Sequence, residues 1–469
     1  MFLPAVLAVF YIVRRRAGKF RVFGVLLTDL ILLVSSLLFY ITFGIRNFVI
    51  LLLQALAGYL FLALIRRNRG GRQKTALLAC GLTAVTALLC FFKYTSFIMP
   101  VALSFTTFSV ISVLADTYRG ECEDCSLPDY LTYVFFFPKL LQGPIMRYPD
   151  HVSEKEKAAS YTPTAEDLSA SLFYFVLGLS KKVLIADRLA KAADYAYSIP
   201  DGLLWMEAVI TVFTYAFQLY FDFSGYCDMG RAVSRLFGYD LPQNFDRPYL
   251  SENVAVFWRR WHMTLSSFFT RYLYIPLGGN RKGLPRKLLN TMIVFLVSGI
   301  WHGTGMNFVI WGAMHGIAVC LAALLKQPLR IPAFIKRALT FVYVSLAWVF
   351  FRAASVGDAL AVLRRVFDKP WFKLHDKFID AYRDDLFWYP IKLLGVKDVR
   401  TGGLICMWLT LGVSALLVFA GRDALMLSGR FRNKLSSGSA VPAAAAAGIL
   451  FIWCVLSFGE VAGFVYFNF

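Results

Sequence analysis

The sequence has few charged residues and lacks the motifs of several common protein classes. Only 17% of its 469 residues are charged, whereas soluble domains carry about a quarter, so an ordinary soluble domain is excluded. No H-E-x-x-H motif and no cysteine–histidine cluster is present, and we therefore expect no metal site. No G-x-x-x-x-G-K loop is present either, which argues against an ATP-driven pump.

Cysteine and histidine are also sparse, with eight and five residues. Cys122 and Cys125 form a lone C-x-x-C in a short loop. Two thiols are too few for a zinc site, and a thioredoxin motif needs a βαβ context that the sequence lacks. An incidental pair of loop thiols is favoured, and their role stays open. Met1–Val13 has no charged n-region and no small-residue cleavage site, so it does not resemble a signal peptide.

Long apolar runs fill most of the chain, which is 58% hydrophobic. Because a transmembrane helix needs about 20 apolar residues, we expect an all-α polytopic membrane protein. The expected architecture has about ten or eleven transmembrane helices plus re-entrant and interfacial helices, all in one domain over residues 1–469. The main runs are Val22–Ile45, Phe48–Ile65, Thr75–Met99, Ser169–Ala186, Leu203–Phe221, Leu288–Ile300, Phe308–Leu325, Ala338–Phe351, Leu404–Ala420 and Val441–Phe458.

The basic residues, which give a net charge of +20, gather between these runs. Arg66–Lys74 is such a segment, and the positive-inside rule places it in the cytoplasm, against anionic membrane lipids. This interpretation is preferred to nucleic-acid binding, because no basic soluble module is present. Asp150–Glu166 is predicted to be a solvated loop, and His151 and His375, in polar segments, are predicted to be exposed. Gln142–Ile145 is predicted to be a re-entrant break.

The other three histidines, His262, His302 and His315, lie between Phe257 and Gly316. An ionisable group at membrane depth is costly, so it usually faces a cavity and has a function. The alternative for any one of them is a hydrogen bond between helices. Burial would keep such an imidazole neutral, and a neutral imidazole can accept a hydroxyl proton. This chemistry suits acyl transfer from a thioester to an alcohol, provided that both reach the ring through a water-accessible pit.

Two carboxylates, Asp222 and Asp228, follow the apolar run Leu203–Phe221. They are candidates for supporting residues of the site. Asp228 and Arg231 are three residues apart, so on a helix they could instead form a structural ion pair.

The region around the histidines resembles the membrane-bound O-acyltransferase (MBOAT) family, and within it the bacterial alginate O-acetyltransferase branch. The segments that carry the resemblance are Phe257–Ser266, Tyr272–Asn280, Ser298–Gly303 and Trp311–Gly316. Further matches are Pro100–Gly120, Phe135–Arg147, Gly178–Asp187, Tyr220–Met229, Leu241–Tyr249 and Ala347–Ala353. The chain departs from the branch at Cys227, where serine is usual, and in a shorter segment before Phe2-Leu3-Pro4.

The resemblance implies a ring of transmembrane helices around a thinned central funnel. It implies that His302, in the Trp-His-Gly motif, is the catalytic histidine and that His262 is its partner. His315 matches a further histidine that is common in the bacterial branch. Supporting roles are expected for His315, Trp301, Trp261, Asp222 and Asp228.

The activity implied is transfer of an acyl group, expected to be acetyl, to hydroxyls of an exported or cell-envelope polysaccharide such as alginate. The donor would be cytoplasmic acetyl-CoA or another acyl thioester, with no permanently bound cofactor. The resemblance also implies a multi-pass protein of the bacterial cytoplasmic (inner) membrane. Its expected partner is an SGNH-hydrolase-like periplasmic or extracellular acetyltransferase.

Two other functions stay open from the sequence. D-alanyl transfer towards teichoic acid is a variant of the same chemistry, although Pro276–Asn280 favours the polysaccharide branch. A proton-coupled transporter is the alternative of a different class, because intramembrane histidines also build proton relays.

Overall fold

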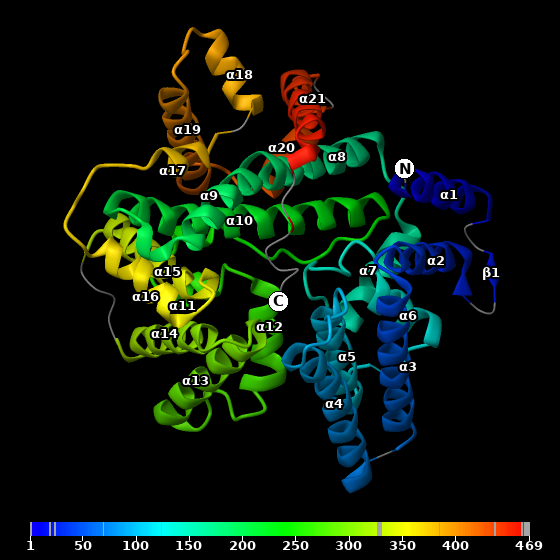
Figure 1. Cartoon of the computed structure of the whole chain (residues 1–469). Helices are drawn as coiled ribbons and strands as arrows, with labels where there is room; N and C mark the ends of the chain where they lie inside the picture. The colour runs from blue at the N-terminus through cyan, green and yellow to red at the C-terminus, as the bar shows by residue number, and fades with distance from the viewer. Residues whose placement is uncertain are drawn as a thin grey trace. The chain divides into compact units, whose positions relative to one another are not determined.

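Helices make up almost all of the regular structure that the described residues show (Figure 1). The computed structural model describes residues 2–17, 20–22, 25–68, 70–122, 124–325, 331–383, 385–435, 438–460 and 463. Arg69, in the predicted cytoplasmic loop, and Glu123, between the two loop cysteines, lie outside them. The described strands are a hairpin of two-residue segments, β1 (Arg21–Val22) and β2 (Val25–Leu26). The predicted all-α class is confirmed.

The chain forms two compact units. Unit 1 comprises Met1–Ser171 and Gly230–Gln243, and unit 2 comprises Leu172–Met229 and Asn244–Phe469. The single domain over residues 1–469 and the ring around a funnel both stay predictions.

Unit 1 is built on α5, which packs against both α3 and α4. A polar seam joins α3 to α5, because Gln54 Nε2 donates to Thr107 Oγ1 at 2.7 Å and its Oε1 accepts from Thr106 Oγ1 at 3.1 Å. Buried polar groups bonded in this way define how two apolar helices meet. The helices are α1 (Phe2–Ala17), α2 (Leu27–Ile41), α3 (Ile45–Arg67), α4 (Gly71–Tyr94), α5 (Leu103–Tyr118), α6 (Leu127–Phe135) and α7 (Tyr148–Ser160).

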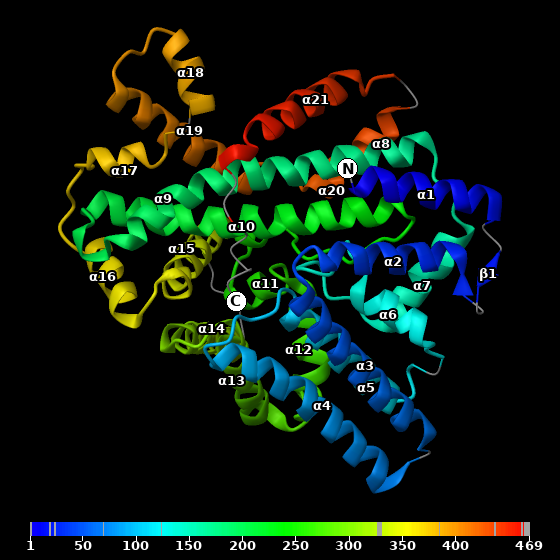
Figure 2. The ribbon, with the colours of Figure 1, turned by 45° about the vertical axis from the view of Figure 1, so that its right-hand side comes forward.

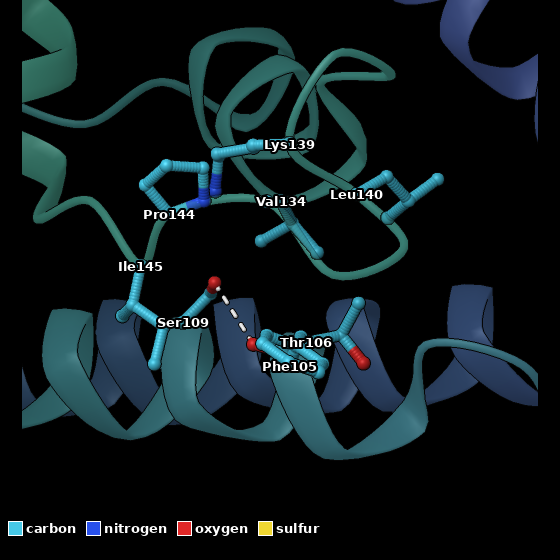
Figure 3. A pocket seen from close by; sticks show the side chains of 9 residues that line it. Phe105, Thr106, Ser109, Val134, Lys139, Leu140, Pro144 and Ile145 are labelled. Carbon is cyan, nitrogen blue, oxygen red and sulfur yellow. Dashed lines mark hydrogen bonds between the residues drawn. The ribbon is translucent and has the colours of Figure 1, made fainter. Parts of the chain in front are cut away.

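The expected re-entrant break follows α6, where residues 136–147 form turns and extended backbone instead of helix. Figure 3 shows Lys139 and Pro144 of this segment facing Thr106 and Ser109 of α5. The Lys139 ammonium lies 4.1 Å from the centroid of the Tyr133 ring, a cation–π contact. Irregular backbone at this place is thus covered by protein, as an apolar environment requires.

The loop predicted over Asp150–Glu166 is wrong, because most of this segment forms α7, although many of its side chains are exposed to solvent as predicted. Lys155 of α7 lies 2.9 Å from the carboxylate of Asp29 and 2.5 Å from that of Asp129, which ties α7 to α2 and α6. The exposure predicted for His151 is also wrong, since its side chain is buried among aromatic rings. Local polarity did not reveal these tertiary contacts.

Unit 2 contains most of two long helices that lie side by side. Residues 165–198 form a continuous helix of 34 residues, in which α8 (Ala165–Ser180) and α9 (Asp187–Ser198) flank a π-helical turn at Lys181–Ala186. This helix lies beside α10 (Trp205–Leu236) in both views (Figure 1, Figure 2). A Cβ atom on Gly178 would lie 2.8 Å from the carbonyl oxygen of Gly225, so the crossing needs glycine.

The amphipathic stretch predicted over Asn253–Leu273 is not one helix. It divides into α11 (Val254–Trp258) and α12 (Met263–Phe269), followed by a π-helical turn. The remaining helices of unit 2 are α13 (Gly283–His302), α14 (Met306–Leu324), α15 (Ala333–Arg352), α16 (Val356–Val366), α17 (Asp376–Asp380), α18 (Asp385–Leu393), α19 (Val399–Phe419), α20 (Ala424–Leu435) and α21 (Val441–Leu456).

Six helices among the described residues are long and apolar enough to cross a membrane: α3, α4, the α8–α9 helix, α14, α15 and α19. Two shorter apolar helices are α2 and α21. The long helices α10 and α13 carry charged side chains and fall outside this set. The multi-pass character is thereby supported, and the number of ten or eleven spans stays a prediction.

Candidate active site

His302 is the last residue of α13, and a short turn leads from it into α14. The two helices pack closely because glycines face carbonyl groups across the contact. A Cβ atom on Gly299 would lie 2.4 Å from Phe308 O, and one on Gly312 would lie 2.4 Å from Phe295 O. No side chain fits in that space, so these glycines set the distance between the two helices that carry His302 and His315.

Asn307, which sequence reasoning did not single out, anchors the turn after His302. Its side-chain Nδ2 donates to the carbonyl oxygens of Phe350 at 3.1 Å and Ala353 at 2.9 Å. The carbonyls at a helix C-terminus lack partners within the helix, so this buried amide ties the start of α14 to the end of α15. The sequence did not distinguish Asn307 from an ordinary turn residue, because asparagine is common in glycine-rich turns.

The His302 ring is 2% exposed and lies among aromatic side chains. Its centroid is 4.4 Å from that of Trp301, 5.1 Å from Trp311 and 4.9 Å from Phe351. The expected chemistry needs a thioester and an alcohol to reach this ring. In the arrangement seen here the aromatic side chains cover it, so substrate access requires some of them to move.

His315, on α14, is buried in a box of aromatic rings that includes Trp258, Trp311 and Trp348. Trp258 Nε1 donates to His315 Nδ1 at 3.2 Å. An indole N–H can only donate, so Nδ1 is unprotonated and a neutral ring carries its proton on Nε2. That Nε2 has no hydrogen-bond partner within the described residues.

His262 has the opposite tautomer, which Asn244 determines. Its Nδ1 lies 3.1 Å from Asn244 Oδ1, and the backbone N–H of Thr264 reaches the same atom at 3.2 Å. A backbone N–H only donates, so this atom is the amide oxygen, and His262 must donate from Nδ1. The lone pair of a neutral His262 is then on Nε2. Burial lowers the pKa of His262 to about 3, so the ring is neutral at physiological pH.

The backbone of His262 is strained, with φ +44° and ψ +53° in the left-handed region. A residue other than glycine is uncommon there, and the cost is on the order of 1 kcal/mol. Asn244 holds this conformation as well, because its carbonyl oxygen accepts from Met263 N at 3.0 Å. The left-handed backbone at His262 separates α11 from α12, so Asn253–Leu273 is not one helix. In the sequence, Asn244 was marked only as part of Leu241–Tyr249, one of the segments that carry the family resemblance.

An aromatic cluster connects the tryptophan before His262 to the other two histidines. Trp261 is buried, and its ring lies 5.1 Å from that of Trp348. Trp348 stacks on Trp311 at 5.6 Å, and Trp311 meets both His302 and His315 edge to face at 5.1 Å. The structure therefore brings together four of the predicted site residues: His302, His315, Trp301 and Trp261.

Asp222 and Asp228 form ion pairs between α10 and the helix beside it, and their supporting role at the site stays a prediction. Lys182 Nζ donates to Asp222 at 2.6 Å, and Lys181 Nζ donates to Asp228 at 2.5 Å. The Asp228–Arg231 pair that the helical spacing allowed is replaced by Lys181–Asp228, and Arg231 donates from Nε to Asp240 at 2.8 Å. Both lysines belong to the π-helical turn, a distortion that is frequent at functional sites.

A cavity of about 230 Å³ lies beside the aromatic rings that surround His315. Segments of α11, α12, α13 and α14 line it, with mostly apolar side chains. Trp258 and Phe295 are in its wall and also contact His315, and Ser298 lies one turn before His302 on α13. Trp258 and Phe295 therefore lie between the cavity and His315.

Comparison with known proteins gives a consistent result. The model of the membrane-bound O-acyltransferase family matches residues 31–355. The chain is 36% identical over 382 residues to a peptidoglycan O-acetyltransferase of Helicobacter pylori, covering 71% of this chain and 72% of that protein. It is 32% identical over 397 residues to the probable alginate O-acetylase AlgI of Pseudomonas aeruginosa, covering 78% and 73%. A teichoic acid D-alanyltransferase of Bacillus subtilis is 27% identical over 231 residues, covering 46% and 56%.

Proposed function

Because the chain belongs to the membrane-bound O-acyltransferase family, and is therefore an acyltransferase, we propose that it serves O-acetylation of a cell-envelope or exported polysaccharide. The observation that carries the proposal is the extent of similarity. The peptidoglycan and alginate O-acetylating relatives align over more than two thirds of both chains, with 36% and 32% identity. The D-alanyltransferase aligns over 46% of this chain, at 27% identity.

The proposed chemistry uses His302 as the proton acceptor. A hydroxyl oxygen attacks the carbonyl carbon of an acetyl thioester, the C–O bond forms, and the C–S bond breaks. The hydroxyl proton passes to the imidazole and then to the departing thiolate, so the ring ends as it began. A neutral imidazole suits this cycle, because a general base must be unprotonated before the reaction.

His262 is proposed as a positioning residue, with the Nε2 lone pair turned outward from Asn244. His315, whose proton is on Nε2, can donate a hydrogen bond to an oxygen on which negative charge develops. The buried tryptophans around them exclude water, which would otherwise compete with the acceptor hydroxyl. The cavity beside Trp258 is where we place the acetyl group before transfer.

The remaining parts of the proposal concern location and partners. The donor is acetyl-CoA or another acyl thioester on the cytoplasmic side of the bacterial inner membrane. The acetyl group crosses through the protein, and an SGNH-hydrolase-like acetyltransferase outside the membrane supplies the hydroxyl that attacks at His302 and then passes the acetyl group to the sugar. The family and the relatives' names support the reaction class, and the basic loop at residues 66–74 supports the orientation.

Deletion of the gene tests the acceptor. We expect the purified envelope and exported glycans of the deletion strain to lose ester-linked acetyl groups, measured by mass spectrometry before and after mild alkaline treatment. Re-expression of the chain should restore them. Unchanged glycan acetylation, together with loss of D-alanyl esters from teichoic acid, would instead favour the D-alanyl alternative.

Replacement of Asn244 tests how His262 is held. A group displaced by about 1 Å from its productive position can lower a rate by about 100-fold. We therefore expect Asn244→Ala to lower acetyl turnover by up to about this factor, because His262 loses the acceptor that orients its ring. Thr264→Val is the matched control, since it removes only the hydroxyl that donates to Asn244 at 2.9 Å. Equal turnover of the two variants would contradict the positioning role.

No observation specifically favours the transporter hypothesis. Its basis was the presence of histidines at membrane depth, and an acyltransferase family accounts for them directly.

A further inference from the structure

A second cavity, of about 330 Å³, lies between α8, α10, α19, α20 and α21. Its walls are largely apolar, with Leu177, Phe221, Leu417, Leu427 and Trp453 among the lining side chains. Its volume is about twice that of a 150 Å³ cavity that holds benzene. A short segment of a fatty acyl chain fits such a space. We name it the α19 cavity.

The polar side of the α19 cavity is rich in cations. Lys181, Arg247 and Arg422 line it, with Asp423 as the acid among them, and Lys181 is already bonded to Asp228. Arg247 adopts a left-handed backbone with φ +45°, and its Nε has no hydrogen-bond partner within the described residues. A strained residue with an unsatisfied buried donor at a cavity indicates a ligand with acceptor oxygens.

The position of the cations along the chain points to the membrane surface. The candidate span α19 ends at Phe419, and Arg422 follows three residues later with an exposed side chain. Basic residues just beyond a span lie at the level of lipid headgroups. Leu417, in the cavity wall, is 44% exposed, so the cavity is bordered by an apolar surface of the kind that faces lipid.

We propose that the α19 cavity binds one anionic phospholipid, with an acyl chain between α8, α19 and α21 and its phosphate at Arg247 and Arg422. Apolar walls with a cationic rim match an anionic amphiphile in both parts. The α19 cavity also lies next to the aromatic cluster of the candidate active site. Tyr220 is in the cavity wall, and its ring centroid is 6.2 Å from that of Trp261. The proposal concerns lipid binding and does not rest on the proposed acetyl transfer.

Binding of short-chain phosphatidylglycerol to the purified full chain in detergent tests this site. We expect saturable binding by the unaltered protein, detected by native mass spectrometry and by a rise in melting temperature. The double variant Arg247→Gln/Arg422→Gln should bind about 25-fold more weakly, since each cation near an anionic lipid contributes about fivefold. Arg364→Gln, which removes an exposed arginine on α16, is the matched control and should bind unchanged.

Three further measurements separate the occupants. Ala424→Phe places a ring in the cavity and should abolish lipid binding. If that variant does not fold, Arg422→Gln alone serves as the second test, and it should weaken lipid binding about fivefold. Equal affinity for phosphatidylcholine would overturn the role of the cations. Displacement of the lipid by coenzyme A would overturn the proposal as well, because it would identify the α19 cavity as a thioester donor site.

Discussion

Replacing His302 with alanine is expected to reduce acetyl transfer by about 100- to 10,000-fold, the usual contribution of a general acid–base group. The side chain is the proposed proton acceptor, and its neighbours Trp301, Trp311 and Phe351 cannot take a proton. The measurement is the rate of acetyl transfer per amount of folded protein, with folding followed by gel filtration and thermal unfolding in detergent.

His375→Ala is the matched control for this experiment. His375 has an exposed side chain beside Glu207, at 3.1 Å, and has no proposed role in the reaction. The buried Glu207 carboxylate keeps its bonds from the backbone N–H groups of Leu204 and His375 in this variant. We expect unchanged turnover. If the His302 variant folds and transfers acetyl groups at the normal rate, the proposed chemistry is wrong.

The largest expected effect on stability comes from Lys182→Met. Lys182 is 2% exposed and lies 2.6 Å from Asp222 and 2.7 Å from Asp187, both of which are also buried. Without the ammonium, two buried carboxylates lose their cation. Removing one partner of a buried ion pair costs about 3–5 kcal/mol, so we expect a large fall in the midpoint of thermal unfolding.

Lys157→Met provides the comparison at an exposed ion pair. Lys157 donates to Glu154 at 2.6 Å, but its side chain is 66% exposed. Such exposed pairs contribute little to stability because water screens them, and we expect almost no change. Adding Asp222→Asn and Asp187→Asn to Lys182→Met should recover much of the lost stability. If the Lys182 variant is as stable as the Lys157 variant, the prediction is wrong. The carboxylates of Asp187 and Asp222 would then have to be solvated without Lys182.

Several features could be predicted from the sequence because they depend on local composition. Apolar runs such as Phe48–Ile65 and Phe308–Leu325 correspond to α3 and α14, since about 20 apolar residues suffice to specify a membrane helix. The break at Gln142–Ile145 was predictable from its glycine and proline, whereas the irregular backbone already begins at Phe136, directly after α6. The segment Asp150–Glu166 was predicted wrongly, because the polar residues that suggested a loop include Lys155, which bonds to Asp29 across the fold.

The candidate site likewise has features that the sequence determined and features that only the tertiary structure decided. The sequence by itself determined that the protein is helical, apolar and a member of an acyltransferase family, and it singled out His262, His302 and His315 by residue type and motif. Only the tertiary structure decided which nitrogen of His262 and His315 carries the proton, because Asn244 and Trp258 approach them from distant parts of the chain. It also paired Asp228 with Lys181 instead of the neighbouring Arg231. The physical reason is that composition and helix period act along the chain, whereas a hydrogen bond or an ion pair depends on where atoms meet in space.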